Sequence, residues 1–389
     1  MTKHNKRAHA LLSASGAARW LNCTPSARLE DKIADKESPY AREGTLAHEF
    51  ADIELQFRDK QITKAKYTAA RKKLEKEEFY NPEMDEEVEK YVDYVWSQYQ
   101  EARRKNGSAV LLVEDKIDLT EFIEEGFGSN DAAIISDNTM EIVDLKYGKG
   151  IKVNAKDNPQ LKLYGLGALR AHELMYDIHE VRMTVVQPRL DHIPSAVLPA
   201  DELRAWGYNE VVPKARLAYA GKGDLVPGDH CRWCKIKARC PALAEENLKL
   251  AKHEFASPEL LSDDELLDIY GKIAMLEDWA KGVANHILDE ALNGKKWPGY
   301  KLVEGRANRK WANEDEAIST LEKEGYEKDK ITKTKIRGIG EIEKLVGKKK
   351  FPKLLNGMVI KPQGKPALVD ESDKRPELNT EECAKQDFT

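Results

Sequence analysis

The sequence lacks the long hydrophobic runs of a membrane protein. No stretch approaches the roughly eighteen consecutive apolar residues that a transmembrane helix needs. The N-terminal segment, MTKHNKRAHALLSAS, is basic but has only a short apolar stretch, so we expect no signal peptide. Cysteine is scarce as well, and four of the five cysteines are grouped by their spacing, which argues against a secreted disulfide scaffold. Together these absences predict a cytoplasmic protein without a membrane partner.

An excess of positive charge is also missing. Lys and Arg number 63 against 68 Asp and Glu, and the formal net charge is −5. This balance gives no sign of nucleic-acid binding, but it does not exclude such binding, because an enzyme needs a local basic groove rather than a basic whole. The 389 residues fit two or three domains, and a hydrophobic content of 41% supports a sizeable core. We find no internal repeat.

The periodicity of apolar residues changes from helical to alternating and back along the first part of the chain. It predicts a helix that opens near Gly44, while residues 58–80 are charged and weakly patterned. Asp137-Asn138 is typical of a hairpin turn between two strands. The other predicted elements are helices over 83–104, 160–174 and 201–220, and strands over 110–119, 132–136, 140–147 and 181–187. This order predicts an α/β fold in which a small mixed sheet is flanked by helices.

The last third of the chain predicts a mostly helical extension. Helices are expected over 242–254 and 263–293, then a short strand over 300–304 and small helices up to about 356. We therefore divide the chain into 1–245, 246–361 and a polar tail over 362–389. The helix over 263–293 has a wide apolar face that suits a homo-oligomer contact. The basic stretches GRANRKW and KKKFPK suit either DNA contact or a solvated surface.

An acidic centre is predicted where two strands meet. In the strand over 140–147 side chains alternate between faces, so Asp144 and Lys146 share the polar face. The hairpin brings that face alongside Asp131. Two carboxylates there would hold Mg²⁺ or Mn²⁺, and Lys146 would orient the attacking water. Taken alone, Asp-x-Lys is a weak motif, because a solvated hairpin face has the same pattern.

Four cysteines have the spacing of a single metal or iron–sulfur site. Cys231, Cys234 and Cys240 follow the pattern C-x₂-C-x₅-C, and Cys23 lies far upstream. Four thiolates satisfy either zinc or an iron–sulfur cluster, and spacing does not separate the two. Unliganded buried cysteines are the third reading. A bound metal would clamp the N-terminal segment to the end of the first domain, so that metal binding would contribute to folding.

Three more residues become informative when their order along the chain is considered. His48 lies on the first predicted helix, and Gln160 and Tyr164 are four residues apart on one helical face. The order His, Gly-x-x-Asp, Asp-x-Lys, Gln-x-x-x-Tyr and three cysteines resembles the RecB-like branch of the PD-(D/E)XK nucleases. The most similar subgroup carries an iron–sulfur staple, as in the AddB nuclease domain and the CRISPR-adaptation exonucleases. The resemblance covers about residues 10–245.

The resemblance implies a role for each of these residues. His48, Asp131 and Asp144 would ligate Mg²⁺ or Mn²⁺, and Lys146 would be catalytic. Gln160 and Tyr164 would support the site and contact DNA. The cysteines would hold a 4Fe–4S cluster; the full set is Cys23, Cys231, Cys234 and Cys240. One departure is Asp144, where many relatives have Glu, although the pattern allows either.

The same resemblance implies a PD-(D/E)XK core with a helical C-terminal extension and a metal-dependent DNA exonuclease. The whole chain is similar to a phage and prophage family of this nuclease type. This implies work in recombination or DNA processing in a bacterial host cell, beside partners such as a single-strand annealing protein. Two other hypotheses stay open: a non-catalytic DNA-binding or assembly protein with the same fold, and a zinc-stabilised structural protein.

Overall fold

The chain forms two compact units, Met1–Trp279 and Ala280–Thr389, in a computed structural model. The division falls within helix α10 (Asp263–Leu292). The domain limits expected near residues 245 and 361 stay predictions. In the described part of the chain, no helix is long and apolar enough to cross a membrane. The structure describes residues 10–34, 38–254, 263–305, 310–332, 336, 338–347, 350–360, 366–370 and 375–377.

A five-stranded sheet forms the centre of the first unit. Its order is β1-β2-β3-β4-β5, and all neighbours are antiparallel except β3 and β4, which are parallel. The parallel pair is joined through helix α6 (Pro159–His172). The predicted α/β class, a mixed sheet flanked by helices, is confirmed. The strands are β1 (Val110–Asp118), β2 (Phe127–Ile135), β3 (Asn138–Leu145), β4 (Ile178–Val186) and β5 (Ser195–Pro199).

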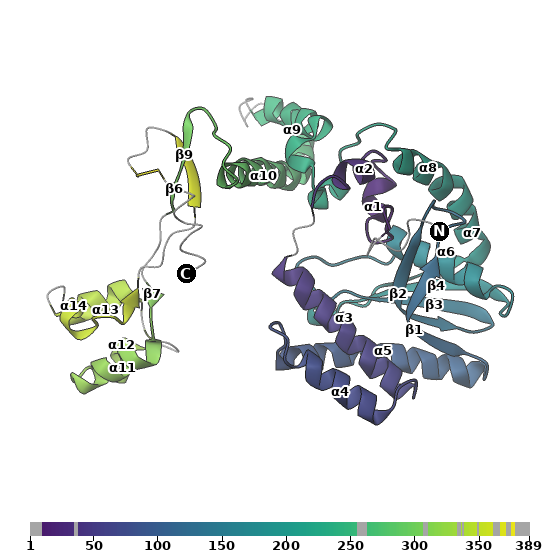
Figure 1. Ribbon diagram of the computed structural model, residues 1–389, viewed down its shortest axis with the longest axis horizontal. Helices are drawn as coiled ribbons and strands as arrows, with labels where there is room; N and C mark the ends of the chain where they lie inside the picture. Colours follow the sequence, from purple (N-terminus) through teal and green to yellow (C-terminus); the bar gives the residue numbers. More distant parts are fainter. Residues whose placement is uncertain are drawn as a thin grey trace. The chain divides into compact units, whose positions relative to one another are not determined.

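Helices cover both faces of this sheet (Figure 1). One face packs on α3 (Pro39–Arg58) and α5 (Pro82–Lys105), with Val143 and Leu145 fully buried between them. The opposite face, which carries Ile142, packs on α6 and on the shorter helices. The alternation was predicted from the sequence, but the face that carries Asp144, which was expected to be polar, is buried as well. The shorter helices are α1 (Ala17–Trp20), α2 (Ser26–Glu30), α7 (Ala200–Trp206) and α8 (Val212–Ala220), with a π turn over Gly207–Val211.

Three long helices begin with the same local signal, a polar cap followed by proline. The side chain of Asn158 accepts hydrogen bonds from the N–H groups of Gln160 and Leu161 at the start of α6. Ser38 and Asn81 cap α3 and α5 in the same way. Each cap satisfies a free N–H group, and proline has the φ angle that the first helical turn needs. The cap at Asn158 therefore sets the position of Gln160.

Some elements differ from those predicted. Residues 58–80 contain helix α4 (Lys64–Leu74), in which Leu74 is the buried side chain. Its apolar stripe is too short for periodicity to reveal. Strand β2 starts several residues before 132, so Asp131 lies within it rather than before it. Strand β5 was not predicted, because its short, half-exposed run carries little hydrophobic signal.

The second unit has a small core of its own. Helix α10 continues into it, whereas α9 (Pro241–Glu254) belongs to the first unit. Trp311 packs partly buried against the core of the second unit, so it does not stand free for stacking. Strand β9 lies in the predicted polar tail and pairs with β6. Residues 306–309, 348–349 and Cys383 lie outside the described residues. The elements are α11 (Glu314–Lys323), α12 (Lys328–Ile331), α13 (Ile339–Val346), α14 (Phe351–Leu354), β6 (Tyr300–Glu304), β7 (Lys310–Trp311), β8 (Val359–Ile360) and β9 (Pro366–Asp370).

Candidate metal centre and cysteine cluster

Asp131 links three elements of the first unit. Its Oδ1 lies 3.1 Å from Nδ1 of His48 on α3. Its Oδ2 accepts a hydrogen bond of 2.6 Å from the backbone N–H of Leu145 on β3. Both carboxylate oxygens are thus engaged, and the side chain is only 16% exposed. Strand pairing and helix packing together hold Asp131 in one orientation.

Four further predicted residues form a continuous polar network beside Asp131. Nζ of Lys146 lies 2.8 Å from Oδ2 of Asp144 and donates to Oε1 of Gln160 at 3.1 Å. Nε2 of Gln160 donates to Oδ1 of Asp144 at 3.1 Å and to the hydroxyl of Tyr164 at 3.2 Å. Gln160 and Tyr164 lie one turn apart on α6, as predicted. The structure therefore brings together residues from the end of β3, the position just after it and α6, which are up to 20 positions apart in the sequence.

The charges in this centre influence one another strongly. Burial raises the pKa of Asp144, and the nearby charge of Asp131 adds to the effect. Burial also acts on Asp131, but the adjacent His48 outweighs it, so the pKa of Asp131 is lowered. For His48 and Lys146, burial disfavours the charged form, yet the carboxylates raise the pKa of both. A bound cation would offset the repulsion between these two buried carboxylates.

The donor atoms match a hard divalent cation. Oδ2 of Asp144 is buried and is paired with Nζ of Lys146 at 2.8 Å. Within the described chain, the three potential metal ligands whose donor atoms all lie within 4.8 Å of one another are His48, Glu114 and Asp131. Carboxylate oxygens with one imidazole suit Mg²⁺ or Mn²⁺. Sequence reasoning missed Glu114, because nothing in the strand over 110–119 distinguishes it locally.

The four predicted cysteines meet around one small cavity. Cys23 lines it together with Cys231, Cys234 and Cys240, and none of them forms a disulfide. The hydroxyl of Thr24 donates to the carbonyl of Lys222 at 2.6 Å, which joins the N-terminal segment to the chain just before the other cysteines. Burial raises the pKa of the Cys234 thiol to about 12. Thiols in such a place become thiolates when a metal binds, so the donor set fits zinc or an iron–sulfur cluster.

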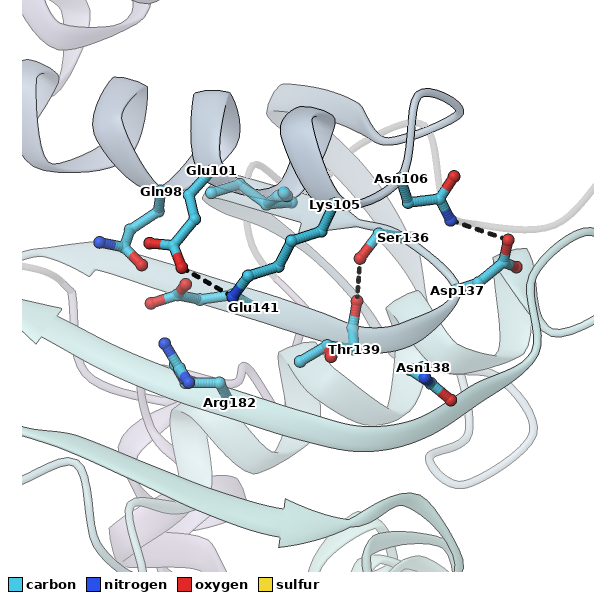
Figure 2. Close-up of a pocket in the computed structure, with 12 residues that line it drawn as sticks. Gln98, Glu101, Lys105, Asn106, Ser136, Asp137, Asn138, Thr139, Glu141 and Arg182 are labelled. Atoms are coloured by element: carbon cyan, nitrogen blue, oxygen red, sulfur yellow. Dashed lines mark hydrogen bonds and ion pairs between the residues drawn. The ribbon is translucent and has the colours of Figure 1, made fainter.

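A separate groove of about 510 Å³ lies between the end of α5 and the turn from β2 to β3. Figure 2 shows Glu101 paired with Lys105, and Asn106 donating to Asp137, along its rim. Glu141 lies at its base and accepts hydrogen bonds from Tyr94 and Thr184. The site residues predicted from the sequence do not line this groove, so we treat it as distinct from the candidate centre.

Comparison with known proteins gives two findings. A family model described as "Protein of unknown function (DUF2800)" matches residues 9–376. A solved structure titled "Crystal structure of SSO0001" is 12% identical, covers 58% of this chain and 96% of that chain, and superposes with a TM-score of 0.22. A likeness of that strength carries no argument about fold or activity.

Proposed function

This chain belongs to the family described as "Protein of unknown function (DUF2800)", and we propose that it is a metal-dependent deoxyribonuclease that hydrolyses DNA phosphodiester bonds as an exonuclease. The observation that carries the proposal is the contact between Lys146 and Asp144 at 2.8 Å, next to Asp131. A buried carboxylate, a lysine and a supporting amide in one network, with a second buried carboxylate beside it, suit metal-assisted phosphodiester hydrolysis.

His48, Asp131 and Asp144 would hold Mg²⁺ or Mn²⁺, which when bound lowers the pKa of water and offsets charge on the phosphate. Lys146 has a pKa raised by Asp144 and Asp131 over the opposing effect of burial, so it is protonated at neutral pH. A protonated lysine donates hydrogen bonds and cannot accept a proton. Lys146 would orient the attacking water and offset negative charge on the phosphate.

Gln160 and Tyr164 act as positioning residues in this proposal. The amide of Gln160 joins Lys146 to Asp144 and also donates to Tyr164, so it fixes the separation of the acid and the lysine. Tyr164 is mostly buried, and burial raises its pKa to about 12, so its hydroxyl stays neutral. Both residues lie beside the reacting groups, where the resemblance to RecB-like nucleases also expects contact with DNA.

Two structural features support the PD-(D/E)XK assignment. The antiparallel strands β1, β2 and β3 bring both acids to one place, and β4 runs parallel to β3 after the helix that carries Gln160. The shared cysteine cavity supports a 4Fe–4S cluster, with zinc as the alternative. Visible absorbance separates the two, because iron–sulfur protein is brown and zinc protein is colourless. Bacterial phage recombination, and a single-strand annealing protein as partner, follow from the resemblance.

The test is degradation of end-labelled linear DNA and closed circular DNA with Mn²⁺ or Mg²⁺, against EDTA as control. Native protein is compared with Asp144→Ala. We expect metal-dependent loss of linear DNA alone, and no loss with the variant. If anaerobically prepared protein cleaves neither substrate, the proposal fails, and a DNA-binding or assembly role replaces it.

A further inference from the structure

The groove between the end of α5 and the turn from β2 to β3 has no part in the proposed chemistry. Its volume of about 510 Å³ lies within the range of about 300–1,000 Å³ that is usual for small-molecule sites. Its lining is mostly polar and comes from α5, the turn, β3 and β4. The groove uses the first residues of β3, whereas Asp144 is next to the last residue of that strand. The groove is therefore a separate candidate site.

Glu141 brings a buried carboxylate to the base of this groove. The residue is only 6% exposed. Its Oε1 accepts hydrogen bonds from the hydroxyls of Tyr94 at 3.0 Å and Thr184 at 2.8 Å, which occupy the lone pairs of that oxygen. Its Oε2 accepts no hydrogen bond from the described residues. A buried carboxylate is costly unless it is paired, so a donor that enters the groove and reaches Oε2 would stabilise it.

Arg182 lies next to Glu141 on the neighbouring strand, yet the two side chains form no ion pair. They are partners in the parallel register of β3 and β4, and both line the groove (Figure 2). Within the described part of the chain, Arg182 forms no hydrogen bond and no ion pair. A guanidinium offers several N–H donors in one planar fork. Opposite charges thus face the same groove, and each has hydrogen-bonding capacity that the protein does not use.

The remaining charges of the groove pair with each other or with an amide. Glu101 pairs with Lys105 at 2.7 Å, and Asp137 accepts a hydrogen bond from Asn106 at 2.8 Å. A metal cation in the groove would meet the unpaired guanidinium, and an inorganic anion would meet the buried carboxylate. Among the described residues that line the groove none is aromatic, so a nucleobase would find no surface to stack on. The lining suits a small molecule that carries both charges.

We propose that this groove binds a free α-amino acid, whose ammonium group donates to Oε2 of Glu141 and whose carboxylate pairs with Arg182. An ammonium is a compact donor that suits a single free oxygen, whereas a carboxylate matches the planar fork of arginine. In an α-amino acid both groups are bonded to the same carbon, and neighbouring strands lie about 4.7–4.9 Å apart, so one molecule can reach both side chains. The proposal does not depend on the proposed nuclease function.

The first measurement is the melting temperature of the full-length protein with each standard L-α-amino acid in turn. At least one should raise it as its concentration rises, because a ligand that binds only the folded state stabilises that state. In calorimetry, the N-acetyl derivative of this amino acid lacks the ammonium group and its amide lacks the carboxylate. Each should bind at least about tenfold more weakly, since a hydrogen bond to a charged group is lost. Stabilisation by no amino acid, or equal binding of either derivative, overturns the proposal.

Two substitutions test the two contacts separately. Arg182→Gln and Glu141→Gln should each weaken binding of the same amino acid at least about tenfold. The matched control is Arg216→Gln, at an exposed arginine of α8 outside the groove, and it should bind like the native protein. Arg182 has no hydrogen bond to lose, so its variant should keep the native melting temperature without ligand. Native affinity in a folded Arg182→Gln variant overturns the assignment.

Discussion

Replacement of Lys146 by alanine is the sharpest test of the proposed chemistry. The substitution removes a charged donor 2.8 Å from Oδ2 of Asp144 and 3.1 Å from Oε1 of Gln160. A group that positions or protonates a reacting atom contributes about 10²–10⁴ in rate. This factor corresponds to about 3–5 kcal/mol of transition-state stabilisation. We therefore expect Lys146→Ala to lower the single-turnover rate of DNA degradation by at least a hundredfold.

Metal binding should respond much less to this change. Without its lysine, Asp144 is a buried carboxylate with less compensation, and its already raised pKa rises further. A divalent cation offsets that penalty, so Mn²⁺ affinity measured by calorimetry should fall by less than about tenfold at neutral pH. Degradation of end-labelled linear DNA at saturating Mn²⁺ then isolates the loss in rate.

The matched control is Lys149→Ala. Lys149 lies three residues further along the chain and is half-exposed, where it pairs with Glu83 at 2.6 Å. A lysine outside the network should matter little, so we expect a rate within about threefold of the native rate. The reasoning is refuted if Lys146→Ala keeps a rate within that same range, or if both variants lose equal activity.

Three other predictions test the fold, the cluster and the paired charges. In Gly167→Ala the new Cβ would lie 1.9 Å from Cγ2 of Ile117, so urea unfolding should show a loss of about 1–3 kcal/mol; unchanged stability would contradict the close packing of α6 on β1. Cys240→Ser should remove the visible absorbance and lower the melting temperature, and an unaltered spectrum would separate Cys240 from the cluster. The pKa of His48 is raised by Asp131 against the effect of burial. A histidine whose pKa is raised on folding stabilises the folded state fully below its unfolded pKa of about 6.5. This stabilisation is lost as the pH rises through the pKa of the folded state. In EDTA, His48→Gln should therefore cost more unfolding free energy near pH 6 than near pH 9, and an equal cost would refute the pairing.

Helix α4 illustrates why some elements escape sequence reasoning. It buries Leu74 but presents charged side chains elsewhere, and Arg71 contacts Asp85 at 2.7 Å and also pairs with Glu75 at 3.0 Å. Ion pairs with distant residues leave no hydrophobic periodicity to detect. The edge strand β5 was missed for a similar reason, because its alternate side chains are only half-buried. By contrast, α5 has a strong apolar stripe, and its predicted limits agree with the structure to within about one residue.

Part of the candidate site could be predicted from the sequence, and part depended on tertiary contacts. Spacing was sufficient to associate Asp144 with Lys146 and Gln160 with Tyr164, because each pair shares one face of one element. Glu114 could not be identified in this way. Its importance depends on strand register, which places it opposite Asp131, and on the packing of α3, which adds His48.

The sequence by itself determined the limits of α5, the alternation of β3 side chains between two faces, and which cysteines share a spacing, whereas α3 begins at Pro39 rather than near Gly44. These properties depend on neighbours within a few positions, through capping, alternation and the φ angle of proline. The tertiary structure places all four predicted cysteines around one cavity, and it alone decided that Glu114 lies opposite Asp131 in the strand register. Each of these joins residues far apart in the chain, and such contacts exist only once strand register and helix packing have brought the segments together.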